Sequence, residues 1–381
     1  MTVIGIFVAV MLAFFLIRLV YNRSALDKLD VKVSFSSSRA TEGAKLTLTT
    51  VLTNSKWLPL PWVAVKLRVS RHLIFADMEN AQITDQYYRN DLYNILMRQR
   101  ITRRLSFTCG RRGYYYIPSV DLAAWDILME SKNAEMVECG AHLTVYPATL
   151  PAPQVDNLCV QIYGQLRARN IMHPDPFSFR GLREYSPNDP LKAINFKASA
   201  KAQELMVNLW EYMNARQVIL LYNLQRYSVW HNEVLDEFTI KVVASLAERL
   251  VHENVPVRFI TNGHCANIAQ ATLPDKITEV PEGVGELHLE RIFETLAHVD
   301  AEQTQVAPFH EILANTAREY KLEPEYWLIS TYHGPELEEV YKDLRAKGAR
   351  TVWILPFSVG LRTAESDIIL SPEIRENVVI V

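Results

Sequence analysis

At 381 residues the chain is long enough for two domains, each with its own hydrophobic core. Its net charge of −3 excludes the global basic excess of a typical nucleic-acid-binding protein. The four cysteines are far apart and form no CxxC pair, which argues against a zinc site or a disulfide framework and indicates a reducing compartment.

The chain begins with an apolar run over residues 3–20, VIGIFVAVMLAFFLIRLV. A run of this length suits a hydrocarbon core of about 30 Å, so the sequence predicts one transmembrane helix within an anchor over residues 1–23. A cleaved signal peptide is the alternative, but no basic segment precedes the run and no small-residue cleavage site follows it. The basic side chains Arg18, Arg23 and Lys28 lie on the C-terminal flank of the run, Arg18 near its end, which predicts a single-pass cell-membrane protein with its soluble part in the cytoplasm.

Residues 29–150 read as an antiparallel β-domain. Alternating apolar residues and short turn signals predict about seven strands, which favours a β-sandwich of immunoglobulin-like type. The polar stretch between Phe75 and Gln99 reads as a loop or an irregular hairpin. The segment RRGYYY over residues 111–116 carries the arginines and aromatics that bind single-stranded nucleic acid, but a glycine turn followed by aromatic strand residues is the simpler interpretation. We therefore expect no nucleic-acid partner.

Residues 151–215 read as a linker that contains one unusually dense stretch, residues 180–210. This stretch combines paired charges, aromatics and the turn cluster SPNDP at residues 186–190. Two interpretations remain open. The stretch is an interdomain clasp, in which Arg183 pairs with Asp189 and the aromatics fill the junction, or it is a recognition surface for a partner or an anion.

The same stretch resembles the signature of the bacterial "domain of unknown function 58" family, G-x-R-x-Y-x-P-G-D-x-x-R-x-I-x-W-x-x-S-A-R. Asn188 replaces the second glycine, Phe196 replaces the tryptophan, and Lys192 and Lys201 replace arginines. The resemblance also covers the flanking domains. The residues that we expect to form the partner-binding or interdomain motif are Gly181, Arg183, Tyr185, Pro187, Asp189, Lys192, Phe196, Ser199 and Lys201.

Residues 216–381 alternate between apolar strands and helical segments. The strand RQVILLY at residues 216–222 is continuously apolar, and a long helix is expected from about Glu233 to Glu253. This alternation predicts a doubly wound α/β domain with a mostly parallel sheet. The overall fold class is thus an α+β multidomain protein. It comprises the N-terminal transmembrane helix, the sandwich and this α/β domain.

The order and size of the α/β half resemble a von Willebrand factor A domain, as the C-terminal half of the family does. Many such domains hold Mg²⁺ with an Asp-x-Ser-x-Ser motif after the first strand, because a carboxylate and hydroxyls are hard oxygen ligands. This chain has Asn223, Gln225 and Tyr227 at those positions. We therefore expect a degenerate site without metal, and no cofactor.

No catalytic motif is present in the sequence. His264 and Cys265 are adjacent, but sequence neighbours rarely have the geometry of a nucleophile and its base. The resemblance implies a non-enzymatic, membrane-anchored adaptor that works with a MoxR-type AAA+ ATPase in assembling or activating protein complexes at the envelope; the client is not specified. The alternatives are a Mg²⁺-dependent ligand-binding or adhesion module and, less favoured, an envelope hydrolase or transglutaminase-related enzyme.

Overall fold

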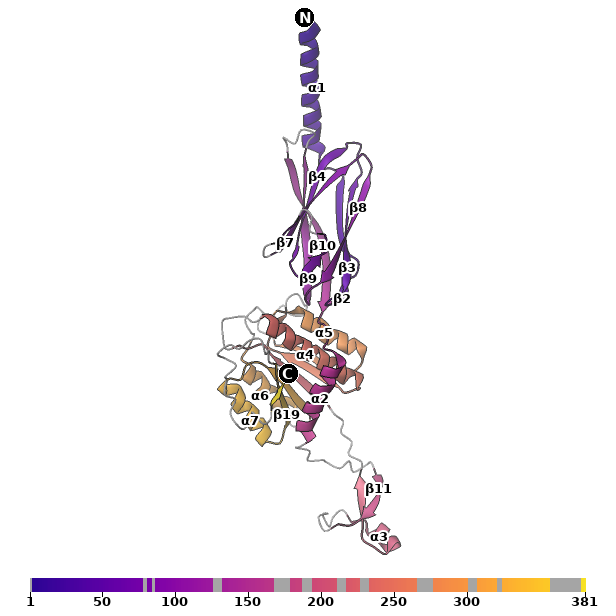
Figure 1. Ribbon diagram of the computed structural model, residues 1–381, viewed down its shortest axis with the longest axis vertical. Helices are drawn as coiled ribbons and strands as arrows, with labels where there is room; N and C mark the ends of the chain where they lie inside the picture. Colours follow the sequence, from indigo (N-terminus) through magenta and orange to yellow (C-terminus); the bar gives the residue numbers. More distant parts are fainter. Residues whose placement is uncertain are drawn as a thin grey trace.

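The computed structural model describes residues 2–77, 81–83, 86–125, 132–167, 179–186, 194–210, 217–226, 233–265, 277–300, 307–320, 324–356 and 378–381. The helix α1 (Thr2–Ser24) stands at one end of the molecule (Figure 1). A β-sandwich, an α/β domain and a small β-hairpin unit follow it in that order along the long axis.

The sandwich consists of two sheets that share one hydrophobic core. The first sheet has the order β1-β3-β8-β5, with β1 (Leu29–Phe35), β3 (Lys45–Asn54), β8 (Arg100–Cys109) and β5 (Leu73–Phe75). The second has the order β2-β10-β9-β4-β7-β6, with β2 (Arg39–Thr41), β10 (Lys132–Tyr146), β9 (Gly113–Trp125), β4 (Leu60–Ser70), β7 (Gln86–Ile95) and β6 (Ala81–Ile83). Neighbouring strands are antiparallel except for the short β2–β10 pair.

The alternation of buried and exposed side chains along each strand explains which residues form the core of the sandwich. In β4, Val63, Val65 and Leu67 are buried, while Lys66 and Arg68 between and after them are exposed. This is the period of two that places one face of a strand on the core and the other in water. The immunoglobulin-like type of the sandwich stays a prediction.

Strand β7 departs from this rule, because its buried face carries charge. Arg89 is 2% exposed and Asp91 is fully buried. The Arg89 Nε donates to both carboxylate oxygens of Asp91, at 2.8 and 2.9 Å, and Arg103 of β8 approaches the same carboxylate at 3.1 Å. Asp77 accepts from the other side of Arg89, at 3.0 Å. The buried charges of Arg89 and Asp91 are therefore neutralised by each other and by Arg103, which comes from the facing sheet.

The C-terminal end of α1 belongs to the sandwich. Tyr21 and Ala25 are buried in its core, and the Tyr21 hydroxyl donates to the carbonyl of Pro59 at 2.9 Å. The ammonium of Lys56 donates to the carbonyls of Ser24, Ala25 and Asp27, at 2.6, 2.5 and 2.9 Å. A lysine that caps the last carbonyls of a helix also complements the negative end of the helix dipole.

The predicted transmembrane helix needs correction. A span requires about 20 consecutive, mainly apolar residues. No helix within the described ranges combines the length and the apolar character needed to cross a membrane. The predicted anchor over residues 1–23, the fold class as far as it includes this span, and the single-pass membrane location are therefore wrong. The end of α1 is instead packed and capped by the sandwich, as Tyr21 and Lys56 show.

The α/β domain contains a six-stranded sheet with the order β16-β14-β13-β18-β19-β20. All neighbouring pairs are parallel except β14–β16. The strands are β13 (Val218–Asn223), β14 (Val257–Thr261), β16 (Thr278–Gly283), β18 (Glu325–Ser330), β19 (Arg350–Leu355) and β20 (Val378–Ile380). The first strand, β13, lies inside the sheet, so the chain winds outward from it in both directions.

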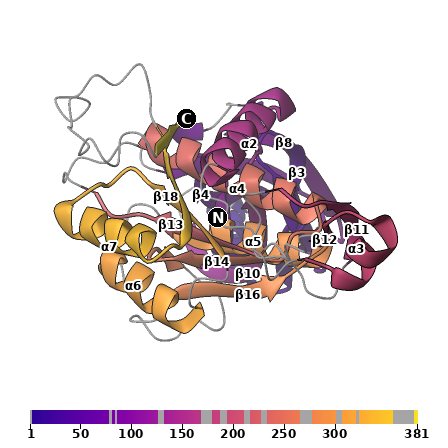
Figure 2. The same cartoon turned by 90° about the horizontal axis from the view of Figure 1, so that it is seen from below.

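Helices cover both faces of this sheet. Helices α2 (Ala152–Arg167), α4 (Glu233–His252) and α5 (Glu286–His298) pack on one face, and α6 (Phe309–Tyr320) and α7 (Pro335–Ala346) pack on the other (Figure 2). Val218, Leu220 and Tyr222 of β13 contribute to the first of these cores, whereas Ile219 and Leu221 contribute to the second. Burial on both sides explains the uninterrupted apolar run of β13. The von Willebrand A-like assignment stays a prediction.

A buried histidine on α5 makes the stability of this domain depend on pH. His288 is 6% exposed, its Nε2 lies 2.8 Å from the carbonyl of Val257, and burial lowers the pKa of the imidazole. The folded-state pKa lies below the unfolded value near 6.5, so protonation favours unfolding. The stability that depends on neutral His288 is present above about pH 6.5 and is lost as the pH falls through the folded pKa.

We therefore expect the stability advantage of the wild type over His288→Gln to shrink between about pH 7.5 and pH 5, by at most about 1.4 kcal/mol per pH unit. Urea unfolding of both proteins across this range measures the difference. Parallel stability curves for the two proteins would show that His288 does not titrate in this way.

Candidate functional site

The predicted signature stretch folds into a small unit of its own. Strands β11 (Phe179–Glu184) and β12 (Met206–Trp210) form a two-stranded antiparallel sheet, and the helix α3 (Phe196–Ala202) packs beside β12. We call these three elements the signature unit. It is inserted between α2 and β13 and lies at the end of the molecule opposite α1 (Figure 1).

Backbone pairing defines the unit. Leu182 pairs with Asn208 and Glu184 with Met206, and the register shifts between Phe179 and Gly181. A glycine is common at such an irregularity because it has no Cβ to obstruct the bend. Beyond the strand, the amide of Tyr185 donates to the carbonyl of Leu205 at 2.8 Å.

Ser199 joins α3 to β12. Its hydroxyl donates to the carbonyl of Asn195 and accepts from the amide of Met206, both at 2.8 Å. Asn195 caps the helix, because its side-chain oxygen accepts from the amide of Ala198 at 3.0 Å, and its own amide donates to Met206 at 2.8 Å. Ser199 is therefore a scaffold residue of the signature: it fixes the orientation of the helix relative to the strand.

Other signature residues lie on the outside of the unit. Phe196 is 74% exposed at the first position of α3. Arg183 and Lys201 are also exposed, and Arg183 donates to the carbonyl of Glu184 at 3.1 Å. Tyr185 is half-buried. Further exposed side chains, outside the nine residues predicted for the motif, are Leu182, Lys197 and Leu205.

Three predicted motif residues, Pro187, Asp189 and Lys192, lie outside the described residues. The proposed pairing of Arg183 with Asp189 is thus untested. The clasp interpretation also expects aromatic side chains to fill a junction between domains. The high exposure of Phe196 favours the recognition interpretation for that residue.

The predicted degenerate metal position lies at the carboxyl ends of the central strands. Asn223 ends β13 and is 2% exposed. Its side-chain nitrogen donates to the Ser330 hydroxyl at 3.0 Å, and its side-chain oxygen accepts from the Asn262 side chain at 3.0 Å and from the amide of Gln225 at 2.8 Å. Tyr227 lies outside the described residues.

This arrangement does not fit Mg²⁺. The oxygen of Asn223 already accepts two hydrogen bonds, and the nitrogen on the same amide is a donor that cannot ligate a metal. The carboxylate of Asp236, in the first turn of α4, is paired with Arg226 at 2.7 Å. Within the described residues no group of three His, Cys, Asp or Glu side chains could hold a metal ion. The strand ends are instead connected by amides and hydroxyls.

The adjacent His264 and Cys265 form the short strand β15 (His264–Cys265), in which successive side chains point to opposite faces. Burial raises the pKa of the Cys265 thiol, and its sulfur accepts from the Thr278 hydroxyl at 3.4 Å. A buried thiol with a raised pKa is a poor nucleophile. The pair therefore does not have the geometry of a catalytic dyad.

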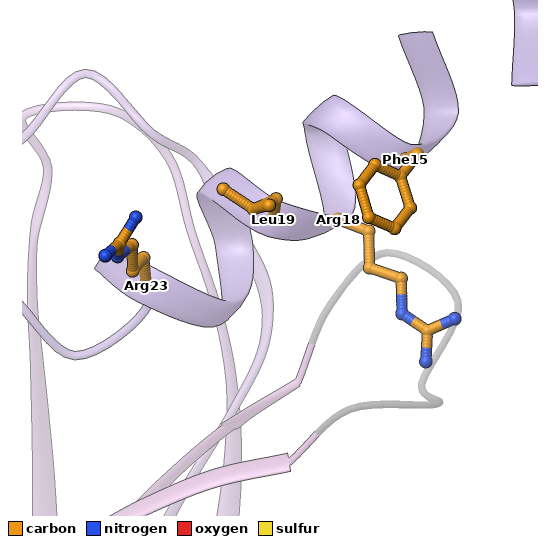
Figure 3. A pocket seen from close by; sticks show the side chains of 4 residues that line it. All are labelled: Phe15, Arg18, Leu19 and Arg23. Carbon is orange, nitrogen blue, oxygen red and sulfur yellow. The ribbon is translucent and has the colours of Figure 1, made fainter. Parts of the chain in front are cut away.

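A hollow of about 370 Å³ lies on the surface of α1 (Figure 3). Its lining consists of Phe15, Arg18, Leu19 and Arg23, and the guanidinium groups of the two arginines point apart. This lining offers neither a nucleophile nor a general base, so the hollow has no catalytic chemistry of its own.

No protein family matches the chain, and no curated protein matches it either. Among solved structures, the chain is similar to a non-cellulosomal cohesin from the archaeon Archaeoglobus fulgidus, at 11% identity and a TM-score of 0.21 over 34% of this chain and 96% of that one. It is also similar to a CARDB domain in complex with di-metal ions from Pyrococcus furiosus, at 13% identity and a TM-score of 0.19 over 31% of this chain and 96% of that one. A third similar structure is the seventh ScaB type I cohesin of Pseudobacteroides cellulosolvens, at 13% identity and a TM-score of 0.19 over 32% of this chain and 95% of that one. Likenesses with TM-scores this low do not bear on the function of this chain.

Proposed function

We propose that the protein is a non-enzymatic adaptor whose signature unit binds a protein partner. One observation carries this proposal: Phe196 is 74% exposed on a helix that Ser199 and Asn195 connect to β12 by hydrogen bonds. A large aromatic side chain on a fixed support is the usual anchor of a protein interface. Its burial in a partner contributes about 1.5–3 kcal/mol of apolar transfer free energy.

The exposed charges of the signature unit are of both signs. Lys197 and Lys201 are exposed on α3 and Arg183 on β11, and the acidic side chains of Glu184 and Glu204 are exposed as well. Charged side chains near an apolar anchor favour a partner with a complementary charge pattern, because complementary charge speeds association and excludes wrong partners. The partner class, a MoxR-type AAA+ ATPase, rests on the family resemblance of the signature, as does the role in assembling or activating other protein complexes.

We expect Phe196→Ala to weaken binding to a purified MoxR-type ATPase of the same organism at least tenfold, because truncating an aromatic anchor costs about 2 kcal/mol or more and a tenfold change in affinity is about 1.4 kcal/mol. Leu287→Ala is the matched control. Leu287 is 76% exposed on α5, outside the signature unit, and should bind as the wild type does. Calorimetric titration of the three proteins gives the dissociation constants, and their thermal unfolding should coincide.

The outcomes separate the parts of the proposal. Equal affinity of Phe196→Ala and wild type would exclude Phe196 as the anchor. If the wild-type protein does not bind the ATPase at all, the partner class is wrong. A loss of stability in Phe196→Ala would contradict the placement of its side chain in solvent.

A further inference from the structure

The sandwich and the α/β domain meet at the turn between β8 and β9. This turn carries Arg111 and Arg112, and both side chains reach into the α/β domain. Gly113 closes the turn with a φ of +150°, which L side chains rarely adopt, and the Tyr115 hydroxyl donates to the carbonyl of Arg111 at 2.7 Å. The turn is therefore held in one shape by its own strand.

Arg112 is the centre of the contact. It is 5% exposed, and its Nη1 donates to the carbonyls of Leu296 and Val299, at 2.6 and 2.8 Å. These carbonyls lie at the C-terminal end of α5, where a cation satisfies unpaired acceptors and complements the helix dipole. The Nη2 of Arg112 lies 3.1 Å from the carboxylate of Glu237 on α4. One guanidinium thus joins two helices of the α/β domain to the sandwich.

Arg111 adds two ion pairs beside it. It lies 2.5 Å from Glu233 and 3.0 Å from Glu237, so Glu237 is shared by both arginines. Lys241, one helical turn further along α4, pairs with Glu42 of the sandwich at 2.7 Å. The acidic side chains at the beginning of α4 therefore face a basic turn.

The contact differs from a common hydrophobic core. The buried apolar residues of the sandwich form one cluster, and those of the α/β domain form two others that share no residue with it. Charged pairs and ring contacts, such as the stack of Tyr114 on His298 at 4.8 Å, connect the two domains. Interfaces of this polar kind let domains move relative to each other once the specific contacts open.

We propose that the Arg111–Arg112 turn is an ion-pair latch that holds the sandwich against α4 and α5. While it is closed, the two domains keep one orientation and the outer face of α4 and α5 next to the turn is covered. When the latch opens, that face becomes accessible. The latch is independent of the signature unit, which lies at the other end of the α/β domain (Figure 1).

Hydrogen exchange of the full-length chain tests this proposal, with Arg112→Ala compared with wild type. We expect the amides of residues 110–116 and 291–299 to exchange at least tenfold faster in the variant. The amides of β3 and β18, inside the two domains, should be unchanged. Arg39→Ala is the matched control, because the Arg39–Glu290 pair at 3.4 Å crosses the same interface but is half exposed on both sides. It should resemble the wild type.

A second variant keeps the proposal testable if Arg112→Ala fails to fold. Glu237→Gln preserves the size of the side chain and removes the charge that both arginines share, so it should also speed exchange in residues 291–299. Exchange at the rate of the Arg39→Ala control in both variants would overturn the latch. Faster exchange in β3 and β18 as well would overturn it too, because Arg112 would then support the domains themselves and not the contact between them.

Discussion

Replacing Asp91 with alanine is expected to lower the free energy of unfolding by about 3–5 kcal/mol, the usual cost of breaking a buried ion pair on one side. Asp91 is fully buried and accepts from Arg89 at 2.8 Å, while Arg103 lies 3.1 Å away. Without the carboxylate, Arg89 stays inside the sandwich, and among the described residues Asp77 is the acidic partner that remains for its charge. Urea unfolding, compared with wild type, measures the loss.

The matched control for this prediction is Asp30→Ala on the same sandwich. The side chain of Asp30 is 57% exposed, and its pair with Lys32 at 3.8 Å is a surface contact, which contributes about 0–1 kcal/mol. If Asp91→Ala lowers the free energy of unfolding no more than Asp30→Ala does, the buried ion pair of Asp91 and Arg89 does not stabilise the sandwich as its distances imply.

A second large effect is expected in the α/β domain, where Trp353→Ala should lower the free energy of unfolding by about 3–5 kcal/mol. Trp353 is fully buried on β19, its ring meets that of Tyr341 edge-on at 5.1 Å, and its Nε1 donates to the carbonyl of Ser330 at 3.2 Å. Alanine removes the ring and leaves a cavity between the sheet and α7. Thermal unfolding of the purified variant is the measurement.

Trp353→Phe separates the two contributions. Phenylalanine keeps most of the aromatic packing and loses the hydrogen bond, so Trp353→Phe should lower the free energy of unfolding by about 1–2 kcal/mol. If the Phe and Ala variants lose the same stability, the hydrogen bond to Ser330 and not the packing of the ring would dominate at this position.

The α/β half was largely readable from the sequence. Strand β13 is buried on both faces, so its apolar run is uninterrupted, and α4 follows the helical spacing of its apolar residues closely. In these elements the spacing of the apolar residues along the chain agrees with the faces that are buried in the fold. Their boundaries therefore lie close to the predicted ones.

Helix α2 was missed, although a signal for it is present. Its buried residues Val155, Leu158, Ile162 and Leu166 recur at helical spacing. The segment was interpreted as a linker because it lies between two recognisable domains and adjoins the signature stretch. The apolar spacing predicts an amphipathic helix, and the structure shows its apolar side packed on the sheet.

Strand β7 is expected from the sequence only as part of one of two alternatives, a loop or an irregular hairpin, and the antiparallel pairing of β6 with β7 confirms the hairpin. The stretch between Phe75 and Gln99 reads as a polar insertion because Arg89 and Asp91 occupy inward positions of the strand. Such residues become acceptable only when partners on another sheet neutralise them, and Arg103 of β8 is one of these. The sequence does not show which distant charges will meet.

The sequence singles out the signature stretch but leaves open whether it is an interdomain clasp or a recognition surface. Nothing in its pattern separates the scaffold role of Ser199 from the solvent position of Phe196. An aromatic in such a motif reads equally well as core. The role of Arg112 was hidden in the same way, because its acceptors are main-chain carbonyls of α5, which have no sequence signature.

The place of the signature unit in the chain has a consequence for biosynthesis. Helix α2 precedes the unit and β13 follows it, yet both belong to one hydrophobic core. During translation, α2 leaves the ribosome while the sheet that it will cover does not yet exist, and the whole unit is made in between. The nascent chain therefore carries an unpaired apolar helix face for that interval, which makes this helix a natural target for a chaperone.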